Sequence, residues 1–265
     1  MTTIAQACAD VLRESDPLAK VRRARAVARA WRRGGLAHEF DAAMPDAPGR
    51  PDRPELLPPN RMPKRGRGGS EKGRIALLHA LAHIEFAAID LAFDAAGRFG
   101  AQFPRSYVDD WISVGADEAM HFAVLHRRLR TLGSGYGELP AHAGLWEAAE
   151  VTAHDAMARL AVVPMVLEAR GLDVTPAMIE KLRALGDEST AGILEIILRE
   201  EVGHVAAGSR WFRWYCEQVG VEPRARFREL LDEYAHGSLR GPFNHAARLA
   251  AGFDAEEIAV LEQLG

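Results

Sequence analysis

Two copies of one short motif constrain the fold of this chain more than any other feature of its sequence. Each copy places a glutamate three residues before a histidine, as Glu118 and His121 in one and as Glu201 and His204 in the other. Residues three apart share one face of an α-helix. Each pair can therefore reach the same object if its segment is helical.

A single glutamate precedes each motif at the same distance. Glu85 lies 33 residues before Glu118, and Glu168 lies 33 residues before Glu201. In the first half, the flanking segments predict an antiparallel helical hairpin, in which a rise of about 1.5 Å per residue places the two carboxylates at one height. The second half fits less neatly, because the helix predicted to hold Glu168 stops soon after it.

The composition favours helix over strand. Ala, Leu, Arg and Glu are abundant while aromatic residues make up 7% of the chain, and this bias predicts an all-α protein. Apolar periodicity and capping residues, such as Ser70 before the first helix, predict four long helices, over about 71–96, 106–131, 145–170 and 187–219. We therefore expect a four-helix bundle over residues 71–219, with a long crossover between its second and third helices.

The segments outside the bundle differ from it in character. Residues 1–45 predict a basic helical appendage. Residues 46–70 are so rich in Pro, Gly and Arg that neither helix nor strand should persist, which predicts an extended strap. Residues 220–265 predict a C-terminal extension of short helices around a turn.

Two prolines lie close to Glu168. Pro164, one helical turn before it, is expected to bend the third helix and to open a coordination position. Thr175 and Pro176 are expected to start a separate short helix, because a capping residue followed by proline is typical of a helix start.

Four helices that supply Glu, Glu-x-x-His, Glu and Glu-x-x-His carry the ligand set of a carboxylate-bridged dimetal centre. The predicted ligands are Glu85, Glu118, His121, Glu168, Glu201 and His204. Two divalent cations would balance the charge of the four glutamates. Without metal, buried carboxylates would repel one another and be driven to protonate. The alternative is a set of surface glutamates and ordinary core histidines.

Two acids next to the motifs are candidates for a supporting role. Asp117 lies four residues before His121, where its carboxylate could accept the second ring N–H and fix the tautomer, and Glu200 holds the matching place for His204. Both acids could equally face solvent.

Two further histidines need an interpretation. His154, about four turns before Glu168 on the same predicted helix, is a candidate to face the substrate or to support the ligands. A third Glu-x-x-His, formed by Glu233 and His236, lacks flanking apolar residues, and we expect it to be coincidental.

Charge is unevenly distributed along the chain. Residues 1–75 hold 16 Lys and Arg against 9 Asp and Glu, a net of +7, which leaves −11 for the remainder. The basic N-terminal arm could contact an anionic partner such as RNA, or it could dock against the acidic remainder.

The sequence predicts a cytoplasmic protein without membrane contact. No stretch approaches the roughly 18 uninterrupted apolar residues of a spanning helix, and the first residues lack the apolar core of a signal peptide. The two cysteines, Cys8 and Cys216, are too few for a disulfide framework or a zinc site and are expected to be buried thiols.

A resemblance to a known family rests on five segments: "HALAHIEFAAIDLAFD", "DWISVGADEAMHF", "YGELPAHAGLW", "RLAVVPMVLEARGLDVTP" and "GHVAAGSRWF". Over roughly residues 50–250 the chain resembles the bacterial family named domain of unknown function 455, in the ferritin-like superfamily. The resemblance implies a ferritin-like bundle whose metal ligands are the six predicted residues, and it implies no activity. The ligand order and the Glu-Ala-Arg at 168–170 are also similar to a di-iron tRNA hydroxylase family, which oxidises an isopentenyl-modified adenosine.

Two hypotheses of function follow. Carboxylate and imidazole ligands without thiolates favour iron, with manganese as the alternative. The first hypothesis is an O₂-activating di-iron oxidoreductase, a hydroxylase or oxidase, acting on an unknown small molecule or a modified nucleotide of tRNA with an electron donor. The second is iron handling by a ferroxidase or storage protein, or a scaffold that metal stabilises without catalysis. A monomer or dimer with two irons fits the first, and a large cage fits storage.

Overall fold

The computed structural model describes residues 1–63, 69–235 and 239–265. The chain divides into two compact units, Met1–Glu150 and Val151–Gly265. Throughout the described residues the regular structure is helical, apart from two isolated β-bridges. The predicted all-α class is therefore confirmed.

The division into units differs from the predicted domains. We expected one bundle over residues 71–219, whereas the boundary between the two compact units falls after Glu150, inside that range. The reason is that long helices pair within each unit, α3 with α4 and α7 with α8. A ferritin-like bundle that combines both units stays a prediction, as do the boundaries of the four predicted domains.

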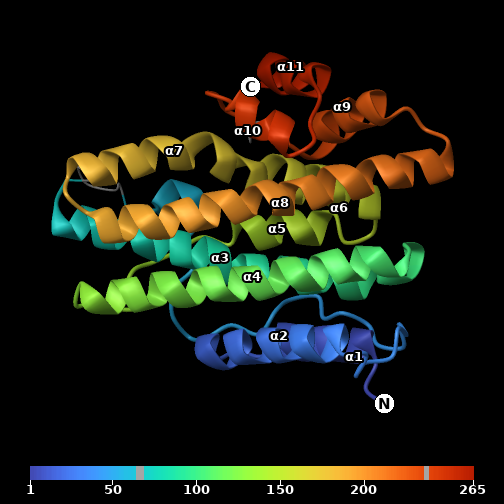
Figure 1. Ribbon diagram of the computed structural model, residues 1–265, viewed down its shortest axis with the longest axis horizontal. Coiled ribbons are helices and arrows are strands. Elements are labelled where there is room, and N and C mark those ends of the chain that lie inside the picture. Colours follow the sequence, from blue (N-terminus) through green and yellow to red (C-terminus); the bar gives the residue numbers. More distant parts are fainter. Residues whose placement is uncertain (64–68, 236–238) are drawn as a thin grey trace. The chain divides into compact units, whose positions relative to one another are not determined.

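An antiparallel hairpin of two long helices forms the centre of the first unit (Figure 1). The helices are α3 (Glu71–Phe99) and α4 (Arg105–Thr131), separated by the short turn η2 (Gly100–Gln102). The Ser70 side chain caps α3, as predicted, by accepting the N–H of Gly73 at 3.1 Å. Close packing requires Gly115 on α4, where a Cβ would lie 2.5 Å from the ring of Phe93.

Two N-terminal helices cover this hairpin. The helix α1 (Ile4–Arg13) packs on α3, and α2 (Pro17–Arg32) packs on α4, as the blue end of the chain shows in Figure 1. Their apolar sides are buried, including Leu12 and Trp31. The basic arm is therefore docked. It forms two helices because Pro17 occupies the first turn of α2 behind the cap Asp16.

A buried ion pair joins α2 to α3. Lys20 Nζ lies 2.5 Å from Asp90 Oδ1, and both side chains are 0% exposed. The same Nζ donates to the carbonyl of Gly49 at 3.1 Å. Burial lowers the pKa of Lys20 and raises the pKa of Asp90 to about 6, and the attraction between the two charges opposes both shifts. Neither charge could stay buried without the other.

The predicted strap is extended where the structure describes it. The N–H of Leu57 donates to the carbonyl of Ala141 at 2.8 Å, and the N–H of Ala141 donates to the carbonyl of Glu55 at 2.9 Å. A short turn, η1 (Pro59–Arg61), follows. The rest of the predicted strap includes residues 64–68, which lie outside the described residues.

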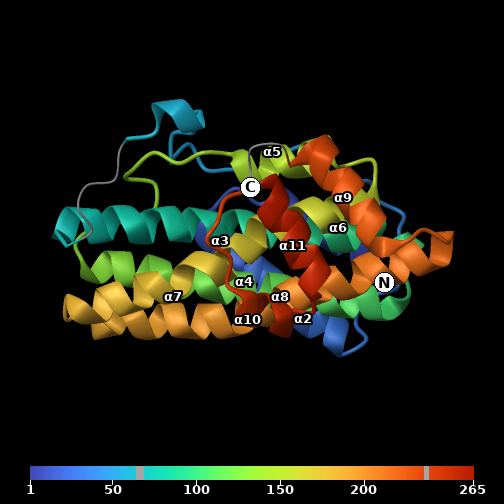
Figure 2. The same ribbon diagram turned by 90° about the horizontal axis from the view of Figure 1, so that it is seen from above.

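The second unit is built on another helical hairpin, α7 (Ala169–Ala184) and α8 (Glu188–Val219). Gly186, with φ of 75°, makes the turn between them. Helix α6 (Ala156–Val162) and the π-helical turn η3 (Val163–Glu168) pack on α8. Figure 2 shows the C-terminal helices of this unit: α9 (Pro223–Tyr234), α10 (His245–Ala250) and α11 (Ala255–Leu264).

The single helix predicted over 145–170 is wrong. The chain forms α5 (Gly144–Val151) and then breaks, because the Asp155 side chain accepts the N–H of Met157 and starts α6. The helix predicted to start at Thr175 is also wrong, since α7 runs through Pro176 without a break. Two short C-terminal helices were expected, and the described residues form α9, α10 and α11.

One helix is long and apolar enough to span a membrane by length and composition alone, although charged residues interrupt its apolar stretch. It is the segment Glu71–Gln102, which contains α3. Of the most apolar 18-residue stretch of this helix, 67% is buried inside the protein. Burial of that kind is also found in the core helix of a globular unit, and α3 is the helix on which α1 and α4 pack.

Candidate metal centre

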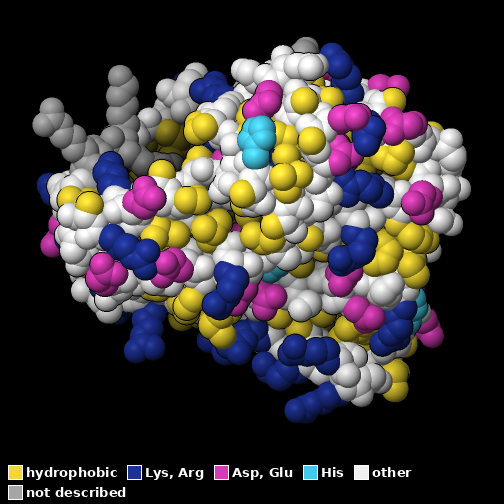
Figure 3. All heavy atoms as spheres, turned by 45° about the horizontal axis from the view of Figure 1, so that its top comes forward, with side chains coloured by type: hydrophobic (Ala, Val, Ile, Leu, Met, Phe, Trp, Pro, Cys, Tyr) yellow, Lys and Arg dark blue, Asp and Glu magenta, His cyan; other side chains and the backbone are white. Residues whose placement is uncertain are grey.

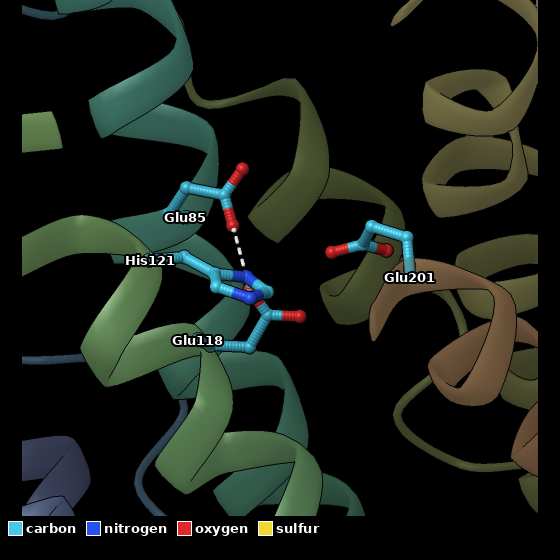
Figure 4. Close-up of side chains that lie close together, drawn as sticks. All are labelled: Glu85, Glu118, His121 and Glu201. Atoms are coloured by element: carbon cyan, nitrogen blue, oxygen red, sulfur yellow. Dashed lines mark hydrogen bonds and ion pairs between the residues drawn. The ribbon is translucent and has the colours of Figure 1, made fainter. Parts of the chain in front are cut away.

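Three predicted ligands lie together in the first unit. Their ligand atoms, from Glu85 on α3 and from Glu118 and His121 on α4, lie within 4.8 Å of one another. His121 Nδ1 lies 3.1 Å from Glu85 Oε2 and 3.4 Å from Glu118 Oε2. Figure 4 shows the contact between His121 and Glu85 as a dashed line. The hairpin thus places Glu85 at the height of the motif on α4, as the spacing predicts.

The three ligand side chains of the first unit are buried, and their burial and mutual contacts shift the pKa values of Glu85 and His121. The side chain of Glu85 is 7% exposed, and those of Glu118 and His121 are each 1% exposed. Burial raises the pKa of Glu85 well above its usual range, and the charge of Glu118 raises it further. Burial lowers the pKa of His121, but hydrogen bonds with Glu118 and Glu85 outweigh it and raise that pKa to about 11. The two carboxylates therefore favour a positive charge between them.

The second unit contains the other half of the pattern. Glu201 Oε1 lies 3.4 Å from His204 Nδ1, and the two side chains are 12% and 5% exposed. Glu168 lies 16 residues before the end of α7 at Ala184, and Glu201 lies 13 residues after the start of α8 at Glu188. The hairpin turn is thus about 24 Å and about 20 Å away along the two helices. The helix therefore does not stop soon after Glu168, because α7 continues from there to the turn.

The backbone that holds Glu168 is π-helical. Glu168 is the last residue of η3, and Pro164 is its second residue. Helix α8 approaches η3 at Gly208, where a Cβ would lie 2.6 Å from the Cβ of Pro164. The helix is therefore irregular at Pro164, and π-helical turns are frequent at functional sites. The expected bend and the open coordination position stay predictions.

The donor chemistry fits a divalent transition metal. Four described residues that could hold a metal ion, each with one ligand atom, are labelled in Figure 4: Glu85, Glu118, His121 and Glu201. Carboxylate and imidazole donors suit iron and manganese. Glu168 and His204, on η3 and α8, stay predicted ligands.

The predicted supporting residues lie as follows. Asp117 is partly exposed on α4. Glu200 on α8 is 36% exposed and lies 3.9 Å from the guanidinium of Arg199. His154 is exposed in the turn before α6, with its Nε2 3.4 Å from the hydroxyl of Tyr234. All three roles stay predictions. His236, of the third Glu-x-x-His, lies outside the described residues.

A group of aromatic side chains in the first unit was not predicted. Phe86 follows Glu85 and Phe122 follows His121, and the centres of the two phenyl rings lie 5.3 Å apart. Tyr136, from the loop after α4, lies 5.4 Å and 5.0 Å from them. The sequence neighbours of the ligands were a usable signal for the two phenylalanines, whereas a loop residue such as Tyr136 gives none.

Comparisons with known proteins agree with the resemblance described above. A family described as "Protein of unknown function (DUF455)" matches residues 13–259. A protein of Haemophilus influenzae, named only as an uncharacterized protein, is 44% identical over 214 residues, which cover 78% of this chain and 74% of that protein. No solved structure matches the chain. With a family match over nearly its whole length, this chain belongs to the DUF455 family.

Proposed function

We propose that this protein binds two metal ions, preferentially iron, and is an O₂-activating oxidoreductase. The observation that carries the proposal is the buried group of Glu85, Glu118 and His121. Two carboxylates and an imidazole whose atoms converge in a protein core are costly unless a cation offsets their charge.

We also propose that the residues of the second unit complete the centre. The support is the repeated spacing of 33 residues, the equal motif on α8, and the low exposure of Glu201 and His204. Six ligands from both units would hold two cations, and the four glutamates would balance their charge.

When bound, two reduced irons would supply electrons to O₂. The chain itself supplies three other things. Glu85 and Glu118 hold negative charge at fixed positions on paired helices. The burial of these side chains excludes water around them, which strengthens electrostatic interactions. The irregular backbone at Glu168 would leave its carboxylate freer to change position than one on an unbroken helix.

The decisive experiment is metal loading without oxygen, followed by O₂ addition. We expect about two irons per chain, and O₂ consumption in the presence of a reductant. The variants Glu118→Gln and Glu201→Gln should both lose iron. Glu233→Gln, in the third Glu-x-x-His, is the matched control and should keep it. Full iron content in Glu118→Gln would refute the proposal. A large assembly that stores many irons per chain would instead support iron handling.

One surface suggests the substrate class. The exposed side of α2 carries a stripe of arginines within about 100° of arc: Arg22, Arg25, Arg29, Arg32 and Arg33. Figure 3 shows Lys and Arg side chains gathered along the lower edge of the molecule, where α2 lies in Figure 1. We propose that this stripe contacts RNA phosphates. A membrane is disfavoured, because the apolar side of α2 is packed on α4 and cannot insert.

Titration of tRNA in an electrophoretic shift assay tests this contact. Charge reversal at Arg25 and Arg29 should weaken binding at least tenfold and reduce its salt dependence. Arg228→Glu, on α9, is the control and should bind tRNA as the unchanged protein does. Binding that ignores the reversal on α2 would leave a small molecule as the better substrate.

A further inference from the structure

A cavity of about 240 Å³ lies in the first unit, between the strap, α3 and the loop after α4. A shallow lobe of about 30 Å³ adjoins it and shares Arg50 and His83 with it. At 100° per residue, Ala80, His83 and Ala87 lie on the side of α3 opposite Glu85. The cavity is therefore separate from the candidate metal centre, on the other side of one helix.

Two polar side chains of the cavity, those of His83 and Tyr136, already form a hydrogen bond with each other. His83 Nε2 lies 3.1 Å from the carbonyl oxygen of His142, and because a carbonyl only accepts, this nitrogen carries the proton. His83 Nδ1 then accepts the Tyr136 hydroxyl at 2.9 Å. The Tyr136 oxygen can still accept one hydrogen bond, and His83 has no remaining capacity.

Two donors of the cavity remain available. Arg50 lines both lobes, and no ion pair or hydrogen bond joins its guanidinium to another described residue. Trp146 lines the second lobe; its side chain is 4% exposed, and its indole N–H has no hydrogen-bond partner among the described residues. A buried N–H without a partner is unfavourable, so this indole would gain from an acceptor that reaches it.

The walls between these donors are apolar. Phe86 and Leu56 line the main cavity, and Ile84, 39% exposed, lines the second lobe. The carboxylates of Asp52 and Glu55 belong to exposed residues on the strap. The volume lies below the roughly 300 Å³ at which pockets for drug-sized ligands begin, so the ligand must be small.

We propose that this cavity binds a small organic acid with an apolar body. Its carboxylate pairs with Arg50, which suits a planar, bidentate partner. Its body lies on Phe86 and Ile84, and one oxygen of the same carboxylate also accepts the indole N–H of Trp146. The site extends the proposed function and does not depend on it, because none of its residues is a predicted metal ligand.

Phenylacetate and phenethylamine are suitable probes, because they share an apolar body and differ in charge. Titration into metal-free protein, followed by the indole N–H resonances, should show millimolar binding of phenylacetate and at least tenfold weaker binding of phenethylamine. The resonance absent from Trp146→Phe should shift most. Inorganic phosphate, which lacks the body, should bind more weakly than phenylacetate.

Variants separate this site from adventitious binding. Arg50→Gln should weaken phenylacetate binding about tenfold, and Ile84→Glu should weaken it through repulsion. Arg61→Gln, on the same strap outside the cavity, should leave it unchanged. The proposal is overturned if the unchanged protein binds neither probe, if phenethylamine binds as well as phenylacetate, or if Arg50→Gln has no effect in a protein of unaltered helicity.

Discussion

The two halves of the Glu and Glu-x-x-His pattern are alike in sequence and unlike in structure. In the first unit, Glu85 lies in the middle of the unbroken helix α3, and Glu118 and His121 are almost fully buried. In the second unit, Glu168 ends a π-helical turn and Glu201 is 12% exposed. The spacing of the glutamates and histidines is the same in both halves. The structural difference between the halves therefore comes from the backbone and its packing.

This difference suggests that the two halves have different roles in metal binding. Helices α3 and α4 are held in place by α1, α2 and a buried ion pair. The ligands of the first half are therefore already in position to bind a cation. The second half depends on a contact between α8 and an irregular turn. We expect the first half to determine metal affinity, and the second to allow ligands to rearrange.

The largest effect should come from the ion pair behind the first half. Asp90→Asn would leave the charge of Lys20 buried without a partner. This should lower the free energy of unfolding by about 3–5 kcal/mol and the melting temperature by roughly 10 °C. Calorimetry measures this loss. Asp10→Asn, which removes an exposed pair with Arg13 on α1, should change stability by less than about 0.5 kcal/mol.

A double replacement makes this prediction sharper. Lys20→Met combined with Asp90→Leu should recover most of the stability, since an apolar pair of similar volume can replace a buried ion pair. If the double variant is no more stable than Asp90→Asn, the pair is not what fixes α2 to α3.

The next effect compares the halves directly. Glu118→Gln should weaken metal binding about 100-fold, or about 2.7 kcal/mol, and Glu201→Gln only about tenfold. The reason is that the buried half cannot recruit water as a substitute ligand. Competition with a chromophoric chelator gives both constants. Equal losses would show that the two halves contribute alike.

A smaller effect concerns the contact beneath Glu168. In Gly208→Ala the new Cβ would collide with the ring of Pro164, and overpacking of this kind costs about 1–3 kcal/mol. Gly203→Ala, one turn earlier on α8 with no atom near its Cβ, should instead stabilise by about 0.5–1 kcal/mol. Chemical denaturation distinguishes them, and a stabilised Gly208→Ala would contradict the close approach.

The smallest effect is a pH dependence from the first half. The pKa of His121 is raised to about 11, so below that pH a metal ion must displace its proton. Metal affinity should therefore rise about tenfold, or about 1.4 kcal/mol, per pH unit between pH 6 and 8. Titration calorimetry in two buffers counts the released protons. Glu85→Gln should flatten this slope, and Glu201→Gln should leave it unchanged.

Local signals in the sequence were sufficient for the central hairpin of the first unit. Ser70 caps α3 as predicted, and both helices of the hairpin begin and end within a few residues of their predicted bounds. Because that hairpin is regular, counting residues was enough to bring Glu85 and His121 together. The aromatic residue Tyr136 escaped prediction, since a loop has no period from which to count.

The second unit shows where local reasoning fails. Pro176 removes the N–H that would bond to the carbonyl of Leu172, which predicts a break. Instead the side chain of Asn244, 72 residues away, donates to that carbonyl at 3.1 Å, and α7 continues. Only the folded chain brings this donor to the helix, so no window of sequence around the proline could reveal it.

The docked N-terminal helices have a practical consequence for any test of the proposed RNA contact. A shortened chain that begins at Ser70 would lose the cation that compensates Asp90 and would expose the apolar side of α4 to water. Such a chain should aggregate, and its failure to retain RNA would say nothing about recognition. Point changes of surface arginines, made while Lys20 stays in place, are the informative route.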